Sequence, residues 1–213
     1  MSVSTWTPDA EEPGRSWRPR VVPDARAVDL PAAEEAARAL LTALGQQLDS
    51  PHLAETPRRM ATALAELLTA EPFDFTTFPN TEEYDELVLV QDIPVTSVCE
   101  HHVLPFTGVA HIGYLPGDRI LGLSKFARLV EVFSRRTQTQ ERLTQQIADH
   151  LQAQLEPRGV GVVVEAEHTC MSLRGARAAG TRTVTSALLG TLRTDASSRA
   201  EFLALTRTHR EPR

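Results

Sequence analysis

The sequence is poor in cysteine, in surplus positive charge and in long hydrophobic runs. Its 213 residues include only two cysteines, too few to staple a domain of this size with disulfides. Lysine and arginine number 22 against 28 acidic residues, and the net charge of −6 argues against a nucleic-acid partner. No apolar run approaches the roughly 20 residues that span a bilayer, which predicts no membrane partner.

The first residues also lack the apolar core of a secretory signal, and the acidic side chains among them argue against a transit peptide. We therefore expect a cytoplasmic protein whose thiols are free for metal binding or chemistry. The hydrophobic fraction of 41% and the charged fraction of 23% are typical of a folded globular chain.

The hydrophobic pattern divides the N-terminal part of the chain in two. Residues 1–28 mix proline, charge and isolated apolar side chains without a period, which predicts a disordered tail. Residues 29–80 predict a helical region, in which Asp29 caps a first helix and a second helix fits residues 56–70. The first helix has one apolar face, made of Ala37, Leu40, Leu41, Leu44 and Leu48.

Residues 81–213 predict an antiparallel sheet packed on helices. The segments LVLVQDIPVTSV and GVAHIGYLP are expected to be strands, separated by a loop that contains Pro105. Two helices follow, with apolar faces made of Phe126, Leu129, Val130 and Phe133, and of Leu143, Ile147, Leu151 and Leu155. The runs VGVVVEAEHTCM and TRTVTSALLGTL then predict a long hairpin, before a short helix over 197–207. The fold class is α+β.

Two short segments contain both cysteines and three of the seven histidines. The first is Cys99-Glu100-His101-His102 and the second is His168-Thr169-Cys170. Thiolate and imidazole are the usual ligands of zinc, and three such ligands leave a fourth position open for water. If residues 160–170 form one strand, His168 and Cys170 point to the same face. The pattern predicts an open, catalytic zinc site.

Such a site would activate a water molecule for attack on an electrophilic carbon. A nearby histidine could carry protons, and His101 and His168 are the candidates. Spacing alone leaves open whether His101 or His102 binds the metal. It also leaves open whether Glu100 orients a ligand or faces solvent. A lone free cysteine is more often a small buried hydrophobe, but the clustering of both cysteines with histidines favours the metal.

Three further places carry charge suited to a nucleotide. Ser124 and Lys125 stand at the start of a predicted helix with Arg128 one turn later, which could hold phosphate. Taken alone, a serine cap with solvated basic residues is the commoner arrangement. Arg174 follows Cys170 closely. Gln140 and Glu141 open the next helix, where a carboxylate could accept two hydrogen bonds from guanine, although a first-turn acid needs no such role.

Taken in order, six segments closely resemble GTP cyclohydrolase I of the zinc-dependent type, from about residue 32 to about 206. They are SVCEHHVLPF, GYLP, GLSKFARLVEVFSRR, QTQERLTQQIADHL, VVVEAEHTCMSLRG and TRTVTSALLG. The resemblance implies the tunnelling fold for a catalytic domain over 81–213. It also implies a toroidal homodecamer with active sites at subunit interfaces. The implied reaction opens the imidazole ring of GTP at C8, releases formate and forms 7,8-dihydroneopterin triphosphate.

The resemblance also implies a role for each matching residue. Cys99, His102 and Cys170 match the ligands of Zn²⁺, and His101 and His168 match the proton-transfer residues. Glu141 matches the carboxylate that anchors guanine, with Gln140 beside it. The triphosphate would be held by Ser124, Lys125, Arg128 and Arg174.

The sequence departs from the family pattern at four positions. Thr137 replaces a usual proline, Val109 a frequent lysine, and Ala178 and Ala179 a frequent Lys-Pro pair. None of the four is a motif ligand, so the chemistry is expected to survive. Two other functions remain alternatives. One is a catalytically silent ring that binds a purine triphosphate and holds a structural zinc. The other is a different tunnelling-fold enzyme, such as a nitrile reductase, which would use a cysteine nucleophile without this zinc set.

Overall fold

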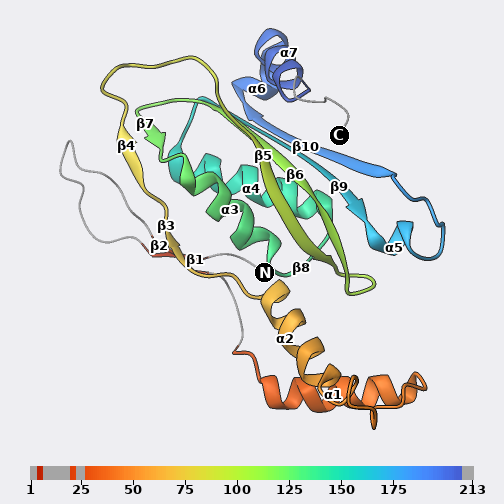
Figure 1. The fold of residues 1–213 in the computed structure, drawn as a ribbon. Helices are drawn as coiled ribbons and strands as arrows, with labels where there is room; N and C mark the ends of the chain where they lie inside the picture. The colour runs from red at the N-terminus through yellow and green to blue at the C-terminus, as the bar shows by residue number, and fades with distance from the viewer. Residues whose placement is uncertain (1–3, 7–19, 23–26, 208–213) are drawn as a thin grey trace.

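The computed structural model describes residues 4–6, 20–22 and 27–207 (Figure 1). Most of the segment expected to be a disordered tail therefore lies outside the described residues. Two pieces of it are strands, β1 (Ser4–Trp6) and β2 (Arg20–Val22), which form a small antiparallel sheet with β3 (Phe73–Asp74). Val21 is fully buried in the main core, so this piece packs on the body of the protein.

A five-stranded sheet in the order β10-β9-β6-β5-β8 forms the centre of the fold. The strands are β5 (Val88–Cys99), β6 (Leu104–Leu115), β8 (Thr137–Gln138), β9 (Gly159–His168) and β10 (Arg182–Gly190). All neighbours are antiparallel except β5 and β8, which are parallel. A second, two-stranded sheet joins β4 (Thr77–Pro79) to β7 (Arg119–Leu121).

Helices α3 (Ser124–Ser134) and α4 (Gln140–Leu155) cover one face of the large sheet (Figure 1). The apolar residues predicted for both helix faces are buried, since Phe126, Leu129, Phe133, Leu143 and Ile147 are each at most 4% exposed. Thr139 caps α4 by accepting a hydrogen bond from the Arg142 amide. The predicted α+β class, with an antiparallel sheet packed on helices, is confirmed.

The chain ends with α6 (Thr191–Thr194) and α7 (Ala196–Leu205), which agrees with the expected closing helix. Phe202 of α7 is fully buried in a smaller apolar cluster with Leu115, Val163 and Leu192. Its ring lies over Gly113 and Gly161, where a β-carbon would come within 3 Å of it. The two glycines therefore make room for α7 against the sheet.

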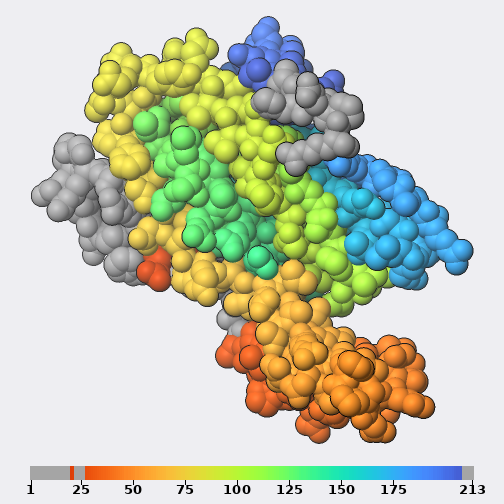
Figure 2. Space-filling view, viewed as in Figure 1, coloured from red at the N-terminus to blue at the C-terminus, as the bar shows by residue number. Residues whose placement is uncertain are grey.

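Helices α1 (Leu30–Ala43) and α2 (Thr56–Leu68) form a hairpin that projects from the body (Figures 1 and 2). Asp29 caps α1 by accepting from the Ala32 amide at 3.1 Å, as predicted. The predicted apolar face of α1 is only partly covered in this chain, because the hairpin stands away from the sheet. Leu40 is 49% exposed. The helix ends at Ala43, so Leu44 and Leu48 lie beyond it and not on its face as expected, and Leu44 is 66% exposed.

Two local expectations were wrong. Pro105 lies within β6 rather than in a loop, because only Glu100–Val103 separate the two long strands. The run that ends in His168 and Cys170 is not one strand, because β9 ends at His168 and the chain continues as a helical turn, α5 (Thr169–Ser172). Among the described residues, no helix is long and apolar enough to cross a bilayer.

His150 of α4 predicts how the stability of the fold depends on pH. Its ring lies edge-on to Phe75 and Phe133, with centroids 5.3 and 5.5 Å away, and its buried Nε2 has no hydrogen-bond partner among the described residues. Burial lowers the pKa of His150 from 6.5 to about 4. Between these values the unfolded chain binds a proton that the native protein does not, so stability falls as the pH drops below 6.5.

We expect this residue to lower the free energy of unfolding by up to ~3 kcal/mol between pH 7 and pH 4. Denaturant unfolding of the parent and of His150→Leu at both pH values measures the effect. Between pH 7 and pH 4 the unfolding free energy of the parent should fall by more than that of the variant, because leucine does not bind a proton. Parallel pH profiles would contradict the prediction.

Candidate active site and metal centre

The turn between β5 and β6 presents three of the predicted site residues. Cys99 is the last residue of β5 and is only 6% exposed. Its carbonyl accepts hydrogen bonds from the amides of His102 and Val103, at 3.3 and 2.9 Å, and Val103 takes a left-handed backbone (φ 53°). This tight turn places Nδ1 of His101 and Nδ1 of His102 each 3.9 Å from the Cys99 sulfur.

Cys170 reaches the same place from β9 through the helical turn α5. The Thr169 hydroxyl donates to the Pro105 carbonyl at 2.6 Å and ties this turn to β6. The sulfurs of Cys170 and Cys99 lie 4.0 Å apart although 71 residues separate them in the sequence. The two segments singled out in the sequence therefore meet in space, but a helical turn rather than a shared strand face aligns Cys170.

The Cys99, His102 and Cys170 side chains have the geometry of a three-ligand metal site. Their ligand atoms all lie within 4.8 Å of one another. A tetrahedral zinc ion with bonds of about 2.3 Å to sulfur and about 2.0 Å to nitrogen separates its ligand atoms by roughly 3.5–3.8 Å. The measured separations of 3.9 and 4.0 Å need little adjustment to reach that range.

The electrostatics of the two thiols agree with this geometry. Burial, and then the neighbouring Cys99 thiol, raise the pKa of Cys170. Two thiols at this distance resist joint ionisation unless a cation compensates their charge. The donor set therefore fits a metal ion.

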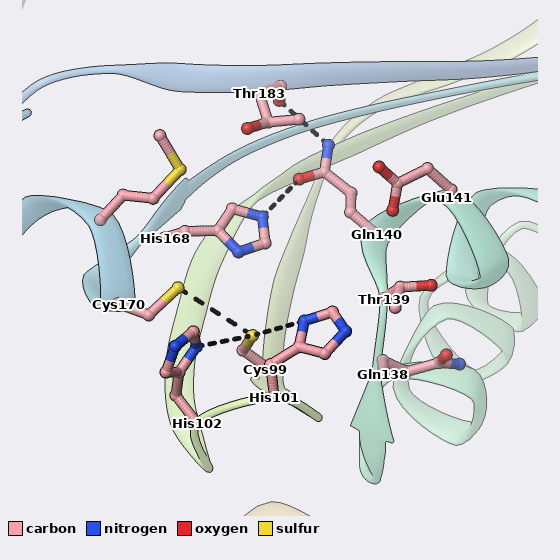
Figure 3. A pocket seen from close by; sticks show the side chains of 11 residues that line it. Cys99, His101, His102, Gln138, Thr139, Gln140, Glu141, His168, Cys170 and Thr183 are labelled. Carbon is pink, nitrogen blue, oxygen red and sulfur yellow. Dashed lines mark hydrogen bonds between the residues drawn. The ribbon is translucent and has the colours of Figure 1, made fainter. Parts of the chain in front are cut away.

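Beside this group lies a cavity of about 230 Å³ (Figure 3). It joins the ends of β5, β8 and β9 to the start of α4, and it is lined by Cys99, His101, His102, Gln138, Thr139, Gln140, Glu141, His168, Cys170, Met171 and Thr183. Ligand pockets for molecules of moderate size usually hold about 300–1,000 Å³. One chain therefore provides less room than a nucleoside triphosphate would be expected to need.

His168 is held rigidly at the edge of this cavity. Its ring stacks on Phe106, with centroids 4.5 Å apart and an interplanar angle of 13°, and its Nε2 lies 2.9 Å from Oε1 of Gln140. Burial lowers the pKa of His168, while the nearby negative charge of Glu141 opposes that shift. The lowered pKa favours the neutral imidazole, which can accept a proton.

The predicted phosphate residues do not reach the cavity within one chain. Its lining does not include Ser124, Lys125, Arg128 or Arg174. Arg128 pairs instead with Glu131 on α3, at 3.2 Å. Ser124 is the first residue of α3 and not its cap, because Leu123 occupies the cap position without a side-chain hydrogen bond.

The structure answers the question that the sequence left open for Glu100. Its carboxylate forms an ion pair with Arg142 of α4, which lowers the pKa of Glu100. Arg142 also donates to the Gln138 side chain at 2.8 Å and to the Thr137 carbonyl at 3.3 Å. Glu100 therefore fastens the turn that carries His101 and His102 to the start of α4.

Sequence reasoning missed four residues of the lining, Gln138, Thr139, Met171 and Thr183. Gln138 is fully buried, and its amide nitrogen donates to the Phe133 carbonyl and to Gln146, both at 2.9 Å. The sequence carried one signal for this group. The polar run Thr137–Gln140 joins two amphipathic helices and contains two glutamines. A simple surface turn would not need these amides, so the run indicates that they have partners inside the protein.

A family model described as GTP cyclohydrolase I matches residues 33–207. The chain belongs to the GTP cyclohydrolase I family. Proteins named GTP cyclohydrolase 1 from Mycobacterium leprae (strain Br4923) and Mycobacterium avium (strain 104) are each 54% identical to it. The matches cover 86% and 84% of this chain and 92% and 91% of those proteins.

A solved structure, the archaeosine synthase QueF-Like in the apo form, matches with a TM-score of 0.41 and 20% identity. It covers 49% of this chain and 93% of its own. Membership of the GTP cyclohydrolase I family rests on the family model and on the sequence relatives.

Three of the four departures from the GTP cyclohydrolase I pattern can be placed in the structure, and none of these three removes a contact around the site. Thr137 contributes its backbone carbonyl to Arg142, which a proline would supply equally. The amide of Ala178 donates to the Met171 carbonyl at 3.0 Å, a bond that does not depend on its side chain. Val109 lies in β6 opposite Pro94 and Glu165, away from the cavity lining.

The ion pair between Glu100 and Arg142 predicts an effect on metal binding. Glu100→Gln removes the charge that holds the turn, so we expect the affinity for added Zn²⁺ to fall about 10-fold or more. Competition with a chromogenic chelator measures it.

The matched control is Glu55→Gln, which breaks an exposed pair with Arg58 on the helical hairpin and should leave the affinity unchanged. Equal affinities for all three proteins would show that the pair does not position the ligands.

Proposed function

We propose that this protein catalyses the GTP cyclohydrolase I reaction, in which water opens the imidazole ring of GTP at C8. One observation carries the proposal: a three-ligand Cys-His-Cys group adjoins a histidine and a carboxylate in one cavity. Three protein ligands with a free fourth position are typical of a catalytic rather than a structural zinc site. A chain of this family with that donor set is suited to hydrolysis.

Zn²⁺ is the metal that this donor set favours, because two thiolates and an imidazole select it over harder cations. Cys99, His102 and Cys170 would hold it. When bound, it would act as a Lewis acid and lower the pKa of a water molecule at the open position.

The chain's own residues account for the proton transfers. His168 is neutral and half-buried, so it can accept a proton as the oxygen of water adds to C8. His101 is exposed at the rim and can deliver a proton to the ring nitrogen as the C8–N bond breaks. A second addition of water at the same carbon releases it as formate. An Amadori-type rearrangement and ring closure, with loss of one water, then give 7,8-dihydroneopterin triphosphate.

Substrate recognition in this proposal is divided between subunits. Glu141 lines the cavity from the first turn of α4, and its carboxylate can accept two hydrogen bonds from the guanine edge. Ser124, Lys125, Arg128 and Arg174 would hold the triphosphate in a site completed by a neighbouring subunit. The small cavity of a single chain and the position of these residues outside it support this division.

We propose a toroidal homodecamer as the assembly that completes the site. The large exposed side chains of Leu40 and Leu44 on the projecting hairpin favour burial against other subunits. A cytoplasmic location belongs to the same proposal. Two thiols 4.0 Å apart remain available to a metal only in a reducing compartment.

Turnover of GTP tests the proposed reaction. The zinc-loaded protein should release formate from GTP and yield a pterin that fluoresces after mild oxidation, in equal amounts. Formate without pterin would indicate an enzyme that stops at the opened ring. Neither product from an assembled, zinc-bound protein would favour the silent purine-triphosphate-binding ring instead.

The proton-transfer role of His101 predicts a specific loss. His101→Ala should retain zinc but lower the rate of formate release by a factor of about 10² to 10⁴, the usual contribution of a general acid or base. His52→Ala, at an exposed histidine between α1 and α2, is the matched control and should keep full activity. Full activity of His101→Ala would remove this residue from the mechanism.

The metal assignment predicts the behaviour of Cys170→Ser. A serine hydroxyl is a poor zinc ligand, so this variant should lose zinc and turnover together. Metal analysis after dialysis measures the first, and formate release measures the second. Stoichiometric zinc in the dialysed variant would contradict the assignment.

A further inference from the structure

Gln140 lies at the cavity, but its side-chain amide points inward and forms hydrogen bonds with other groups of the protein. The residue is only 1% exposed. Its Nε2 lies 2.9 Å from the Val164 carbonyl, 3.0 Å from the Thr183 carbonyl and 3.2 Å from the Thr185 hydroxyl. With these partners in place, little of Gln140 remains to contact a substrate.

The two backbone carbonyls determine which way the amide of Gln140 faces. A carbonyl can only accept a hydrogen bond, so the atom between Val164 and Thr183 must be the amide nitrogen. The amide oxygen therefore points the other way, toward Nε2 of His168 at 2.9 Å (Figure 3). Reversing the amide would place its oxygen against the two carbonyl oxygens, neither of which can donate a hydrogen bond.

The tautomer of His168 follows from this orientation. The Gln140 oxygen accepts, so Nε2 of His168 must carry the hydrogen. In the neutral ring Nδ1 then keeps its lone pair. The ring plane is fixed by stacking on Phe106, and the edge that carries Nδ1 faces the cysteine side of the pocket (Figure 3).

We propose that Gln140 is a positioning residue that holds His168 as the Nε2–H tautomer, so that Nδ1 is the atom that accepts the proton in the reaction. The lone pair on Nδ1 takes a proton from water as the water oxygen bonds to C8. The resulting imidazolium keeps its Nε2–H bond to Gln140 and later loses the Nδ1 proton to solvent, while His101 delivers the proton to the leaving nitrogen. This inference rests on the proposed function, and it gives Gln140 a different role from the substrate contact that the family resemblance implies.

The direct test measures which tautomer His168 adopts. In the zinc-loaded assembly labelled with ¹⁵N-histidine, solid-state NMR at neutral pH should show a protonated Nε2 and an unprotonated Nδ1 for His168. A His168→Gln sample identifies its signals by difference. A hydrogen on Nδ1 of His168 in the parent protein would overturn the proposal.

Kinetics of Gln140→Met give the second test, because methionine keeps the length and volume of the side chain but cannot bond to the ring. We expect kcat for formate release to fall about 10- to 100-fold with KM changed less than about 3-fold, and the ¹⁵N signals to show a mixture of tautomers. A rise in KM with kcat unchanged would mean that Gln140 contacts substrate, and would overturn the proposal.

A control variant separates the loss of the Gln140–His168 hydrogen bond from a general loss of stability. Tyr114→Phe removes a buried hydroxyl that accepts from the Leu121 amide at 3.1 Å, at the other end of β6. It should lower the thermal stability as Gln140→Met does, yet keep kcat and the His168 tautomer. An equal loss of kcat in both variants would overturn the proposal. Failure of the parent enzyme to release formate would instead refute the proposed function, while the tautomer measurement would still stand.

Discussion

The register of β6 between β5 and β9 is the constraint on which the whole site depends. Cys99 pairs with Leu104 at one edge of β6, and Phe106 pairs with His168 at the other. Side chains alternate between the two faces of a strand, so a slip of one residue would turn His168 away from the cavity. Gly161 of β9 lies under the Phe202 ring, where a β-carbon would come within 3 Å of the ring, so a slip that placed a valine there would be costly.

The start of α4 is the second fixed point, and buried glutamines hold it. Gln138 and Gln140 are at most 1% exposed, and both satisfy their polar atoms with carbonyls or side chains of the surrounding elements. An unsatisfied buried amide would cost about 1–3 kcal/mol, so each bonded amide fixes the position of its neighbours. Gln138 anchors Arg142, which holds Glu100, and Gln140 anchors His168. The turn that carries His101 and His102 and the ring of His168 are thus attached to the same helix end.

Two features explain why the site in one chain looks incomplete. The Cys-His-Cys group, His168 and Glu141 gather at one end of the large sheet, whereas Lys125 and Arg128 lie on α3 outside the cavity. The hairpin leaves Leu40 and Leu44 exposed. Both features favour the proposed assembly, in which neighbouring subunits would cover this apolar surface and complete the anion site.

The sequence alone determined the helices α3 and α4, the hairpin of β9 and β10, and the candidate metal residues. These depend on local periodicity and on residue types with distinctive chemistry, such as Cys99 and Cys170. Only the tertiary structure decided that Cys170 is placed by a helical turn, that Glu100 pairs with Arg142, and that Gln140 faces His168. Those contacts join residues 28 to 71 positions apart, and chain folding and strand register determine them rather than any local pattern.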